Sequence, residues 1–514
     1  MNVITRIVFF TSALLAVSCE DKTENVTPTP YTVLSVAAGG AKDALGRISE
    51  SHTCALLNGG KVKCWGGNSY GQLGLGDRDA RGDDSSDMGN NLGFVDLGSG
   101  HTAKAISTGG LHSCAILEND TLKCWGYNFF GQLGIESTND MGDETGEMGA
   151  SLPTVNLGTG RTALAVALGR WHSCALLDDN TMKCWGYNFG GELGQDDNAL
   201  RGTFANSMGD NIVAINLGAG RTATAIAAGD HMSCAILDDA TLKCWGKNTS
   251  GQLGQESVTT LGDNPGEMAA LPAINLGTGR TAVSVAVGGE DFYGHVCAIL
   301  DNSTLKCWGY NLSGQLGYED VSSRGDSLGE MGDTLTAIGL GTGLVPSQVS
   351  VGHNHTCVVF TDSTIKCWGI NSTGQLGVEH TNSIGDGGSE MDDNLVLVNL
   401  GSGLLTSAHS ASRHTCAILT TGKLKCWGNN FTSALGLGDR VDRGDRLLQD
   451  SLRRRRGHAR AHRRRQEAHS RRDEGRQLRL LPLRRLPRVL RRPLANTGFP
   501  GRHAGNHSSV RPEL

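Results

Sequence analysis

Fourteen of the 15 cysteines form seven pairs whose two members always stand ten residues apart. The pairs are Cys54 and Cys64, Cys114 and Cys124, Cys174 and Cys184, Cys234 and Cys244, Cys297 and Cys307, Cys357 and Cys367, and Cys416 and Cys426. In six units a histidine stands two residues before the first cysteine: His52, His112, His172, His295, His355 and His414. Residues two apart on a strand share a face, so a histidine and two thiolates could offer a metal three ligands. Disulfide formation would consume the thiolates, and the remaining unit has its histidine, His231, one place too early. We therefore predict disulfides and no metal site.

Short strands joined by tight turns would hold each cysteine pair. In the third unit, residues 173–177 and 182–185 are rich in apolar side chains and flank an Asp-Asp-Asn turn at 178–180. The symmetry centre of this hairpin places Cys174 opposite Cys184. Directly opposed residues of an antiparallel pair have Cα atoms about 4.5–5.5 Å apart, within the range that a disulfide spans. Each bridge would close a loop of about eleven residues and contribute roughly 2.5–3 kcal/mol in the chain-entropy model.

The cysteine pairs belong to an internal repeat. The second cysteine recurs at intervals of 60, 60, 60, 63, 60 and 59 residues. In the third unit, residues 154–157, 163–168, 173–177 and 182–185 are short, apolar-rich and bounded by glycine or Asp/Asn turns. Glycine, at 73 of 514 residues, agrees with many turns, and no long amphipathic helix is predicted. Four strands in each of seven units predict an all-β fold, a seven-bladed β-propeller with four-stranded blades.

The repeat resembles that of the regulator of chromosome condensation (RCC) repeat family. A His-[Ser/Thr] pair opens one strand, and Trp-Gly-x-Asn-x-x-Gly-Gln-Leu-Gly follows the next at 65–74, 125–134, 245–254, 308–317 and 368–377. Two units depart from this text, at 191–194 without the glutamine and at 433–436 without the first glycine and the glutamine. The resemblance covers residues 32–445 and implies a seven-bladed β-propeller in which the histidine is structural. The cysteine pair is an addition to the family's usual pattern.

Members of this family include a chromatin-bound nucleotide exchange factor, a plant light sensor and secreted inhibitors of β-lactamase. The fold therefore implies no single activity. Residues 1–18, which resemble an export signal, argue against nucleotide exchange in the nucleus. Seven of the eight tryptophans stand one per blade, whereas light sensing needs a tryptophan cluster. Protein binding outside the cytoplasm remains.

The N-terminus predicts export. Residues 1–18 have one early cation and an apolar run at 7–17, which is short for a transmembrane helix and typical of a signal peptide. The Ala-Val-Ser-Cys text at 16–19 resembles a bacterial lipobox, although Leu15 stands one place earlier than the usual branched residue. We therefore expect lipidation at Cys19, a polar tether over 19–31, and attachment to the outer membrane or cell surface through the lipid alone. The alternative is an ordinary secretory signal in which Cys19 is incidental.

The C-terminal residues break the repeat. The seventh unit follows the others to residue 445 and then stops, so the last blade is expected to be incomplete. Residues 451–514 hold 19 arginines, no lysine and 4 acids, which leaves a net charge of −21 on residues 1–450. The composition of 446–514 predicts a disordered, Arg-rich tail and is typical of a gene translated in a shifted frame. A basic tail for anionic polymers is the alternative, whereas no nucleic acid is expected to bind the acidic propeller.

Two recurring polar motifs are interpreted as turns. Acidic loops at 76–84, 325–333 and 385–393 offer carboxylates that calcium could use, but they match neither an EF-hand nor a glycine-rich calcium repeat. Calcium binding by these loops stays open. Arg-Gly-Asp recurs at 81–83, 324–326 and 443–445, an equivalent position in each repeat, which indicates a turn rather than an adhesion motif.

One variable position of the repeat supplies the predicted binding face. The sharpest break in symmetry is in the fifth unit, where residues 289–294 add three residues. The slot just before the histidine changes from unit to unit, and equivalent slots of a propeller lie on one face. Trp, Phe, Tyr, Met and Arg are the side chains that protein interfaces favour, whereas packing over the blade cores is the alternative. The candidates are Leu111, Trp171, His231, Met232, Phe292, Tyr293, Asn354 and Arg413.

No catalytic constellation stands out, because every Ser, His and Asp near another belongs to the repeating text. We therefore predict a non-enzymatic, exported and surface-anchored propeller without a cofactor. It would display a face that binds a protein or a glycan. The alternatives are an exported protein inhibitor that plugs the active site of a partner enzyme, and a propeller enzyme with a cleft on one face.

Overall fold

The computed structural model of the chain describes residues 31–44, 46 and 49–444. The predicted signal peptide, Cys19 and the Arg-rich tail lie outside the described residues, as does all but the last residue of the tether. No helix in the described part of the chain is long and apolar enough to cross a membrane.

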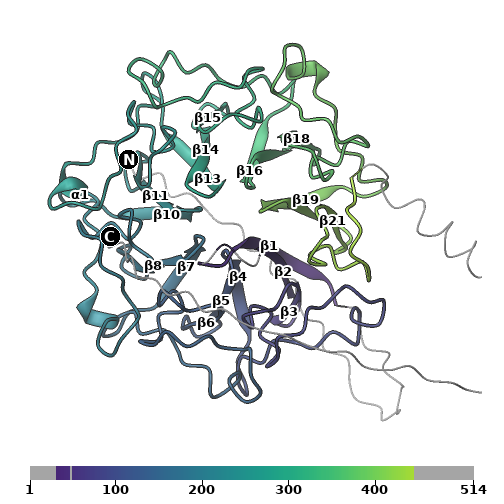
Figure 1. Cartoon of the computed structure of the whole chain (residues 1–514). Coiled ribbons are helices and arrows are strands. Elements are labelled where there is room, and N and C mark those ends of the chain that lie inside the picture. Colours follow the sequence, from purple (N-terminus) through teal and green to yellow (C-terminus); the bar gives the residue numbers. More distant parts are fainter. Residues whose placement is uncertain (1–30, 45, 47–48, 445–514) are drawn as a thin grey trace, which may run out of the picture. The chain divides into compact units, whose positions relative to one another are not determined.

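Seven antiparallel sheets stand around a common centre, as the prediction of a seven-bladed ring requires (Figure 1). Each sheet holds three strands in chain order, and we number these blades 1 to 7 along the chain. Blades 1 to 3 are β1 (Val33–Lys42), β2 (Ser49–Leu57), β3 (Lys61–Gly66); β4 (Ala103–Thr108), β5 (His112–Leu117), β6 (Leu122–Gly126); and β7 (Ala163–Leu168), β8 (His172–Leu177), β9 (Met182–Gly186). Blades 4 and 5 are β10 (Ala223–Ala228), β11 (Met232–Leu237), β12 (Leu242–Gly246); and β13 (Ala282–Glu290), β14 (Tyr293–Leu300), β15 (Leu305–Gly309). Blades 6 and 7 are β16 (Pro346–Val351), β17 (His355–Phe360), β18 (Ile365–Gly369); and β19 (Leu405–Ala411), β20 (His414–Leu419), β21 (Leu424–Gly428). The one α-helix in the described residues is the four-residue α1 (Glu267–Ala270).

The prediction of four strands per blade is wrong, because the fourth segment does not form a strand. Residues 152–157 reach β6 through one bridge and one hydrogen bond, from Val155 N to Leu122 O at 2.8 Å. Side chains form hydrogen bonds with the backbone groups that follow. Asn156 Oδ1 accepts from Gly158 N, and Leu157 O accepts from Lys183 Nζ of the next blade. A backbone whose polar groups are satisfied by side chains needs no ladder. We call the six such pieces the outer segments: 92–97, 152–157, 212–217, 271–276, 335–340 and 395–400.

The disulfide prediction is confirmed in all seven blades. Each pair occupies directly opposed positions of the second and third strands, and the Cα atoms of every pair are 4.1 Å apart, slightly closer than the sequence led us to expect. Each bridge ties the two strands of one hairpin, so the disulfides stabilise blades and not the joints between them. In blade order, the bridges join Cys54 to Cys64, Cys114 to Cys124, Cys174 to Cys184, Cys234 to Cys244, Cys297 to Cys307, Cys357 to Cys367 and Cys416 to Cys426.

Buried histidines join neighbouring blades. The Nε2 atom of His112 lies 2.9 Å from Ser173 Oγ of the next blade, and this hydroxyl donates its own proton to Gln132 O at 2.7 Å. The hydroxyl must therefore accept, which makes Nε2 the protonated nitrogen of a neutral ring. Burial lowers the pKa of His112 to about 3. The same bond occurs in six joints: His52–Ser113, His112–Ser173, His172–Ser233, His295–Thr356, His355–Thr415 and His414–Thr53.

The joint between blades 4 and 5 replaces this bond with an apolar pair. Met232 occupies the histidine position of β11, and Val296 occupies the hydroxyl position of β14. Both side chains are buried in one apolar cluster with Leu242 and Trp308. Both halves of the bond are changed together, so neither a donor nor an acceptor is left buried without a partner.

The repeated tryptophan makes a second bond between blades. Trp185 Nε1 donates to Gln132 O of the preceding blade at 3.0 Å, and the last joint is closed by Trp65 Nε1 and Ala434 O at 2.9 Å. The apolar core lies in these joints, as where Cys114 and Leu122 of blade 2 share a cluster with Trp185 of blade 3. The ring is therefore closed by side chains, with the first blade beside the last (Figure 1).

Candidate binding face

Two hairpins are longer than their equivalents and extend the face of the ring on which the first and second strands of each blade are joined. Strands β13 and β14 have nine and eight residues and β1 and β2 have ten and nine, whereas the same strands of blades 2, 3, 4 and 6 have six each. The tip of the β13–β14 hairpin is the pair Asp291 and Phe292, both with positive φ, at 52° and 75°. The insertion seen in the sequence therefore forms a tight two-residue turn.

The hairpin tip is bound by charged side chains of other blades. Asp291 accepts from Lys42 Nζ of blade 1 at 2.5 Å and from Arg170 Nη1 of blade 3 at 2.7 Å. Arg170 also lies 3.3 Å from Asp230 Oδ1, and the backbone N–H of Phe292 donates to Asp230 Oδ2 at 2.8 Å. Both Arg170 and Asp230 are buried, so removing either one would leave the charge of the other in the interior without this partner.

Glu290, beside the tip, extends the network to blades 6 and 7. Its carboxylate lies 2.8 Å from Arg413 Nη2, 3.4 Å from His353 Nδ1 and 3.9 Å from Lys42 Nζ. Burial alone would raise the pKa of Glu290, but His353 and Arg413 outweigh it and hold the pKa well below its usual range. The carboxylate therefore stays ionised, and the tip is fixed to several blades at once.

A buried glutamate at the end of blade 3 reaches a histidine of blade 4. Glu192 stands where five of the other six repeats have glutamine, and its Oε1 atom lies 3.2 Å from Nδ1 of His231. Both side chains are almost completely buried. The imidazole of His231 stacks on Phe292, with 4.5 Å between ring centroids and 19° between planes. The hairpin tip of blade 5 thus packs on His231, and His231 occupies this place because the histidine of blade 4 is shifted by one residue from its position in the other repeats.

Aromatic rings form a continuous row that ends at the tip. Neighbouring centroids lie between 4.5 and 6.4 Å apart from blade 1 to blade 5. We call this set the aromatic row: Tyr70, Tyr127, Phe129, Phe130, Trp171, Tyr187, Phe189, His231 and Phe292. Phe129, Phe189 and Phe292 are exposed by 59, 55 and 41%, and Tyr293 beside them by 48%. Large apolar rings on a rigid base are what protein interfaces favour.

The centre of the ring contains a cavity of about 330 Å³ between the seven innermost strands. Its lining is mostly backbone and small side chains, such as Gly39, Gly109 and Gly288, with Arg170, Asp230 and His353 among the polar groups. Glycine is required where blades approach: a Cβ on Gly109 would lie 2.5 Å from Gly169 O. The glycines at the centre therefore allow the innermost strands of neighbouring blades to pack closely.

Of the eight predicted face residues, four are buried, three are exposed and one is half-buried. Leu111, Trp171, His231 and Met232 are buried, as the alternative of packing over blade cores expects. Phe292 and Tyr293 are exposed. Arg413 is also exposed, although its guanidinium is bonded to Glu290. Asn354 is half-buried and accepts from Gln315 Nε2 at 3.2 Å. The exposed members lie at or beside the hairpin tip and its charged partners.

Four exposed apolar residues of this face were missed in the sequence. They are Phe129, Phe189, Leu312 and Phe431, all at the position after the asparagine of the Trp-Gly-x-Asn motif. The other units have Ser69, Thr249 and Ser372 there. A variable position inside otherwise constant text was the available signal, and the slot before the histidine drew attention away from it.

The described residues offer no metal site. No group of three or more His, Cys, Asp or Glu side chains among them could hold an ion. The acidic loop at 325–333 uses a carboxylate on its own backbone: Glu330 Oε2 accepts from the N–H groups of Gly325, Asp326 and Ser327. The Arg-Gly-Asp text is also occupied, since Arg81 pairs with Asp77 and Asp83 with Arg440.

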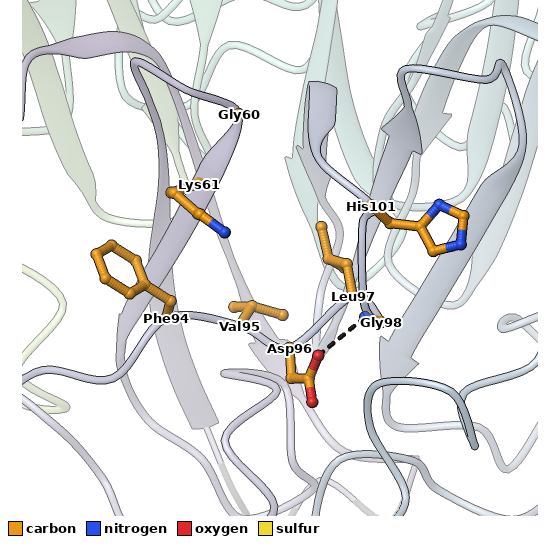
Figure 2. Close-up of a pocket in the computed structure, with 8 residues that line it drawn as sticks. All are labelled: Gly60, Lys61, Phe94, Val95, Asp96, Leu97, Gly98 and His101. Atoms are coloured by element: carbon orange, nitrogen blue, oxygen red, sulfur yellow. Dashed lines mark hydrogen bonds between the residues drawn. The ribbon is translucent and has the colours of Figure 1, made fainter.

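A second cavity, of about 230 Å³, lies in blade 1 beside its outer segment. Figure 2 shows its lining, from Lys61 and Phe94 on one side to His101 on the other, with Asp96 bonded to the backbone N–H of Gly98. The equivalent bond in the next repeat runs from Gly158 N to Asn156. This cavity is therefore an ordinary turn of the repeat and not a catalytic cluster.

Six segments of the chain match the family model of the regulator of chromosome condensation (RCC1) repeat. The matched residues are 48–72, 103–132, 164–192, 223–252, 347–375 and 412–432. They fall in blades 1, 2, 3, 4, 6 and 7, and blade 5, which carries the β13–β14 hairpin, is not among them. These matches support the RCC repeat family that the sequence resembles.

The chain is also similar to proteins of known name and to solved structures. The chain is 27% identical over 433 residues to the ultraviolet-B receptor UVR8 of Arabidopsis thaliana, which covers 84% of both chains. It is 28% identical over 358 residues to an X-linked retinitis pigmentosa GTPase regulator homolog of Caenorhabditis elegans, and spans 23% of that protein's length. Among solved structures, Prp20p of Saccharomyces cerevisiae superposes with a TM-score of 0.57 at 17% identity over 82% of this chain and 85% of its own. Human WBSCR16 gives a TM-score of 0.54, also at 17% identity, over 74% and 91%. At such identities the structures show the propeller fold alone.

Proposed function

We propose that this chain is a non-enzymatic binding module that recognises a protein through the hairpin tip and the exposed members of the aromatic row. One observation carries the proposal: Phe129, Phe189, Phe292 and Tyr293 are exposed, the first two on packed aromatic rings and the last two at a tip that charged bonds fix in place. Rigid aromatic side chains lose little conformational entropy on binding, so they contribute strongly to interfaces.

The solved relatives support a protein partner rather than a small molecule. The crystal structure of Prp20p is described together with the binding of Prp20p to Gsp1p and histones. A second crystal structure contains Kap60 bound to the same protein. Light sensing has no support in the tryptophans, because Trp171 has Phe130, Tyr187, His231 and Arg170 as its ring neighbours. A glycan remains the alternative ligand, since exposed aromatic rings also stack on sugars.

The compartment is part of the proposal. Seven disulfides, one in each blade, are typical of proteins that fold in an oxidising environment. Together with the signal peptide and Cys19 expected from the sequence, they favour export and attachment through a lipid. Mass spectrometry of the mature protein tests this: a diacylglyceryl group on an N-terminal Cys19 is expected, and a mature N-terminus elsewhere would contradict it.

The binding proposal is tested by placing a photo-crosslinking amino acid at chosen positions in intact cells. At positions 189 and 293 we expect a cross-link to one partner protein. Phe204 provides the matched control, because it is a phenylalanine exposed by 63% outside the aromatic row. Equal cross-linking at 204, or none at 189 and 293, would contradict the proposal. Binding of the purified protein to a glycan array that Phe189→Ala abolishes would replace the protein partner by a sugar.

A further inference from the structure

Among the described residues, nothing covers the outer edge of the third strand of blade 7. In each of the other six blades, one carbonyl of the third strand accepts a hydrogen bond from its outer segment, as Leu122 O does from Val155 N. The equivalent carbonyl of β21 belongs to Leu424, and no donor reaches it from any described residue. The open edge thus presents an unused acceptor at a position where six equivalents are bonded.

Burial shows the same difference. Leu122, Lys123 and Cys124 of β6 are buried, and β9, β12, β15 and β18 are buried throughout. In β21 the corresponding Leu424, Lys425 and Cys426 are only partly buried. Because the side chains are of the same types, the missing cover and not the sequence of the strand explains their exposure.

A lysine of the neighbouring blade marks where the cover would lie. Lys123 Nζ donates to Gly149 O of its own blade and to Leu97 O, the last residue of the preceding outer segment. Lys63 is its equivalent in blade 1, where Nζ donates to Gly89 O and lies 4.6 Å from the centroid of the Phe94 ring. Among the described residues, Lys63 has no second acceptor equivalent to the carbonyl that ends a preceding outer segment. Leu424 O and one remaining donor position of Lys63 Nζ therefore mark the same place on either side of the last joint.

The six outer segments define the chemistry of the absent piece. Each carries the same pattern, Leu/Ile-x-x-Val/Ile-x-Leu-Gly, and all 18 of its apolar side chains are buried. A segment that fills blade 7 must therefore bring the same three apolar side chains to the joint. The six sets are Leu92, Val95 and Leu97; Leu152, Val155 and Leu157; Ile212, Ile215 and Leu217; Leu271, Ile274 and Leu276; Leu335, Ile338 and Leu340; and Leu395, Val398 and Leu400.

The chain's own flanking sequences do not carry this pattern in register. Aligned on β1, the stretch before it has polar residues at the three apolar positions: Lys22, Asn25 and Thr27. Aligned on Arg443, the stretch after it has Arg454, Gly457 and Ala459. A second copy of the chain has its six apolar segments buried in its own blades. Neither the two flanking stretches, in these alignments, nor a second copy of the chain therefore offers a free segment with the three apolar side chains.

We infer that the outer edge of β21 binds an extended segment of another polypeptide with the pattern Leu/Ile-x-x-Val/Ile-x-Leu-Gly, antiparallel to the strand. Its central Val/Ile N–H donates to Leu424 O, and its last leucine carbonyl accepts from Lys63 Nζ. Its apolar side chains cover Leu424 and Cys426 and pack toward Trp65, which shares a cluster with Leu424. Addition of a strand to a sheet edge gives affinity through the backbone and selectivity through alternate side chains. The site is separate from the hairpin tip, so it stands independently of the proposed face.

The test uses the full-length, oxidised protein and a labelled peptide with the sequence of residues 151–158, Ser-Leu-Pro-Thr-Val-Asn-Leu-Gly. We expect saturable binding by fluorescence anisotropy. Methylation of the valine nitrogen, which removes the donor to Leu424, should weaken binding at least tenfold, and so should Val→Asp in the peptide. Lys63→Met should weaken it severalfold, whereas Lys61→Met, an exposed lysine of the same strand, should leave it unchanged.

A photo-crosslinking residue at the valine position locates the bound peptide. Cross-links to β21 support the inference, and cross-links confined to other blades overturn it. Absence of binding, or binding that valine N-methylation leaves unchanged, also overturns it. A cross-linker at position 424 of the unliganded chain that captures residues before 31 or after 444 shows that the chain covers its own edge. A stable dimer that cross-links at this edge instead assigns it to a second copy. Either result replaces the external strand.

Discussion

The joint between blades 2 and 3 and the joint between blades 7 and 1 have the same inner bonds and differ at the outside. Each has a histidine bonded to a hydroxyl, His112 to Ser173 and His414 to Thr53, and each has a tryptophan bonded to a carbonyl. The first joint also has an outer segment and a lysine, Lys183, bonded on both sides. The last joint lacks these in the described residues. The comparison teaches that the inner bonds close the ring, whereas the outer segments bury the rim.

Acid should produce the largest effect and should act on every joint that contains a histidine. Burial lowers the native pKa of His172 to about 3, against 6.5 in an unfolded chain. The unfolded chain then binds the extra proton between these values, so stability is complete above pH 6.5 and is lost as the pH falls toward 3. Each such histidine costs about 1.4 kcal/mol per pH unit, and six together should unfold the ring well above pH 3. Urea unfolding at pH 7, 6 and 5 measures this slope.

The matched variant for the acid prediction copies the joint of blades 4 and 5. His172→Met with Ser233→Val should reduce the pH slope by about 1.4 kcal/mol per unit, because one titrating group is removed. An unchanged slope would show that other groups control acid unfolding.

Removal of a joint tryptophan should give the next largest effect. Trp185→Ala deletes a fully buried ring and its bond to Gln132 O, and should lower the free energy of unfolding by about 3–5 kcal/mol. Trp65→Ala in the last joint should cost less, because the core cluster around Trp65 contains fewer buried side chains. Chemical unfolding of both variants makes the comparison, and equal losses would contradict it.

The disulfides should differ in how readily they are reduced, but each should contribute about equally to the free energy of unfolding. Loops of the same length predict that Cys174→Ser with Cys184→Ser, and Cys416→Ser with Cys426→Ser, each cost about 2.5–3 kcal/mol. Cys426 is partly exposed at the open edge, whereas Cys184 is buried. Under native conditions a small thiol should therefore reduce the Cys416–Cys426 bridge first, which alkylation and peptide mapping can follow. Simultaneous reduction of all seven would mean that global unfolding controls access.

The histidine bond itself should be worth less than a ring or a bridge. Ser173→Val leaves the Nε2 proton of His112 buried without an acceptor and should cost about 1–3 kcal/mol. Adding His112→Met, which recreates the Met232 and Val296 pair, should recover much of this loss. A double variant less stable than the sum of the two single variants would show that the apolar pair depends on its own surroundings.

The smallest predicted difference concerns the lysines. Lys123→Met removes two bonds to buried carbonyls and should cost about 1–3 kcal/mol. Lys63→Met removes one bond of a partly exposed side chain, so we expect a smaller loss. Thermal unfolding of the two variants measures the difference, and a larger loss for Lys63→Met would indicate that its joint is already covered.

The sequence predicted those features that depend on near neighbours in the chain. The spacing of Cys174 and Cys184 determined both the hairpin and the bridge, and the insertion at 289–294 became the long hairpin. The outer strand was wrong because periodicity cannot show that Lys183, from the next blade, takes the carbonyl of Leu157. The burial of Trp171 and His231 was the alternative that the sequence left open, and it could not be decided because Phe130 and Phe292, which contact them, come from other repeats. The change from Gln to Glu at position 192 was visible, but its partner stands 39 residues away.

The tip of the β13–β14 hairpin has a mechanical consequence. Asp291 and Phe292 of blade 5 are bound by Lys42, Arg170 and Asp230, which belong to blades 1, 3 and 4. A ring joined only between neighbours would deform one joint at a time, whereas these cross-ring bonds distribute a local load among distant blades. A protein that pulls on Phe292 would therefore be resisted by most of the ring at once, and the tip would keep its shape under tension.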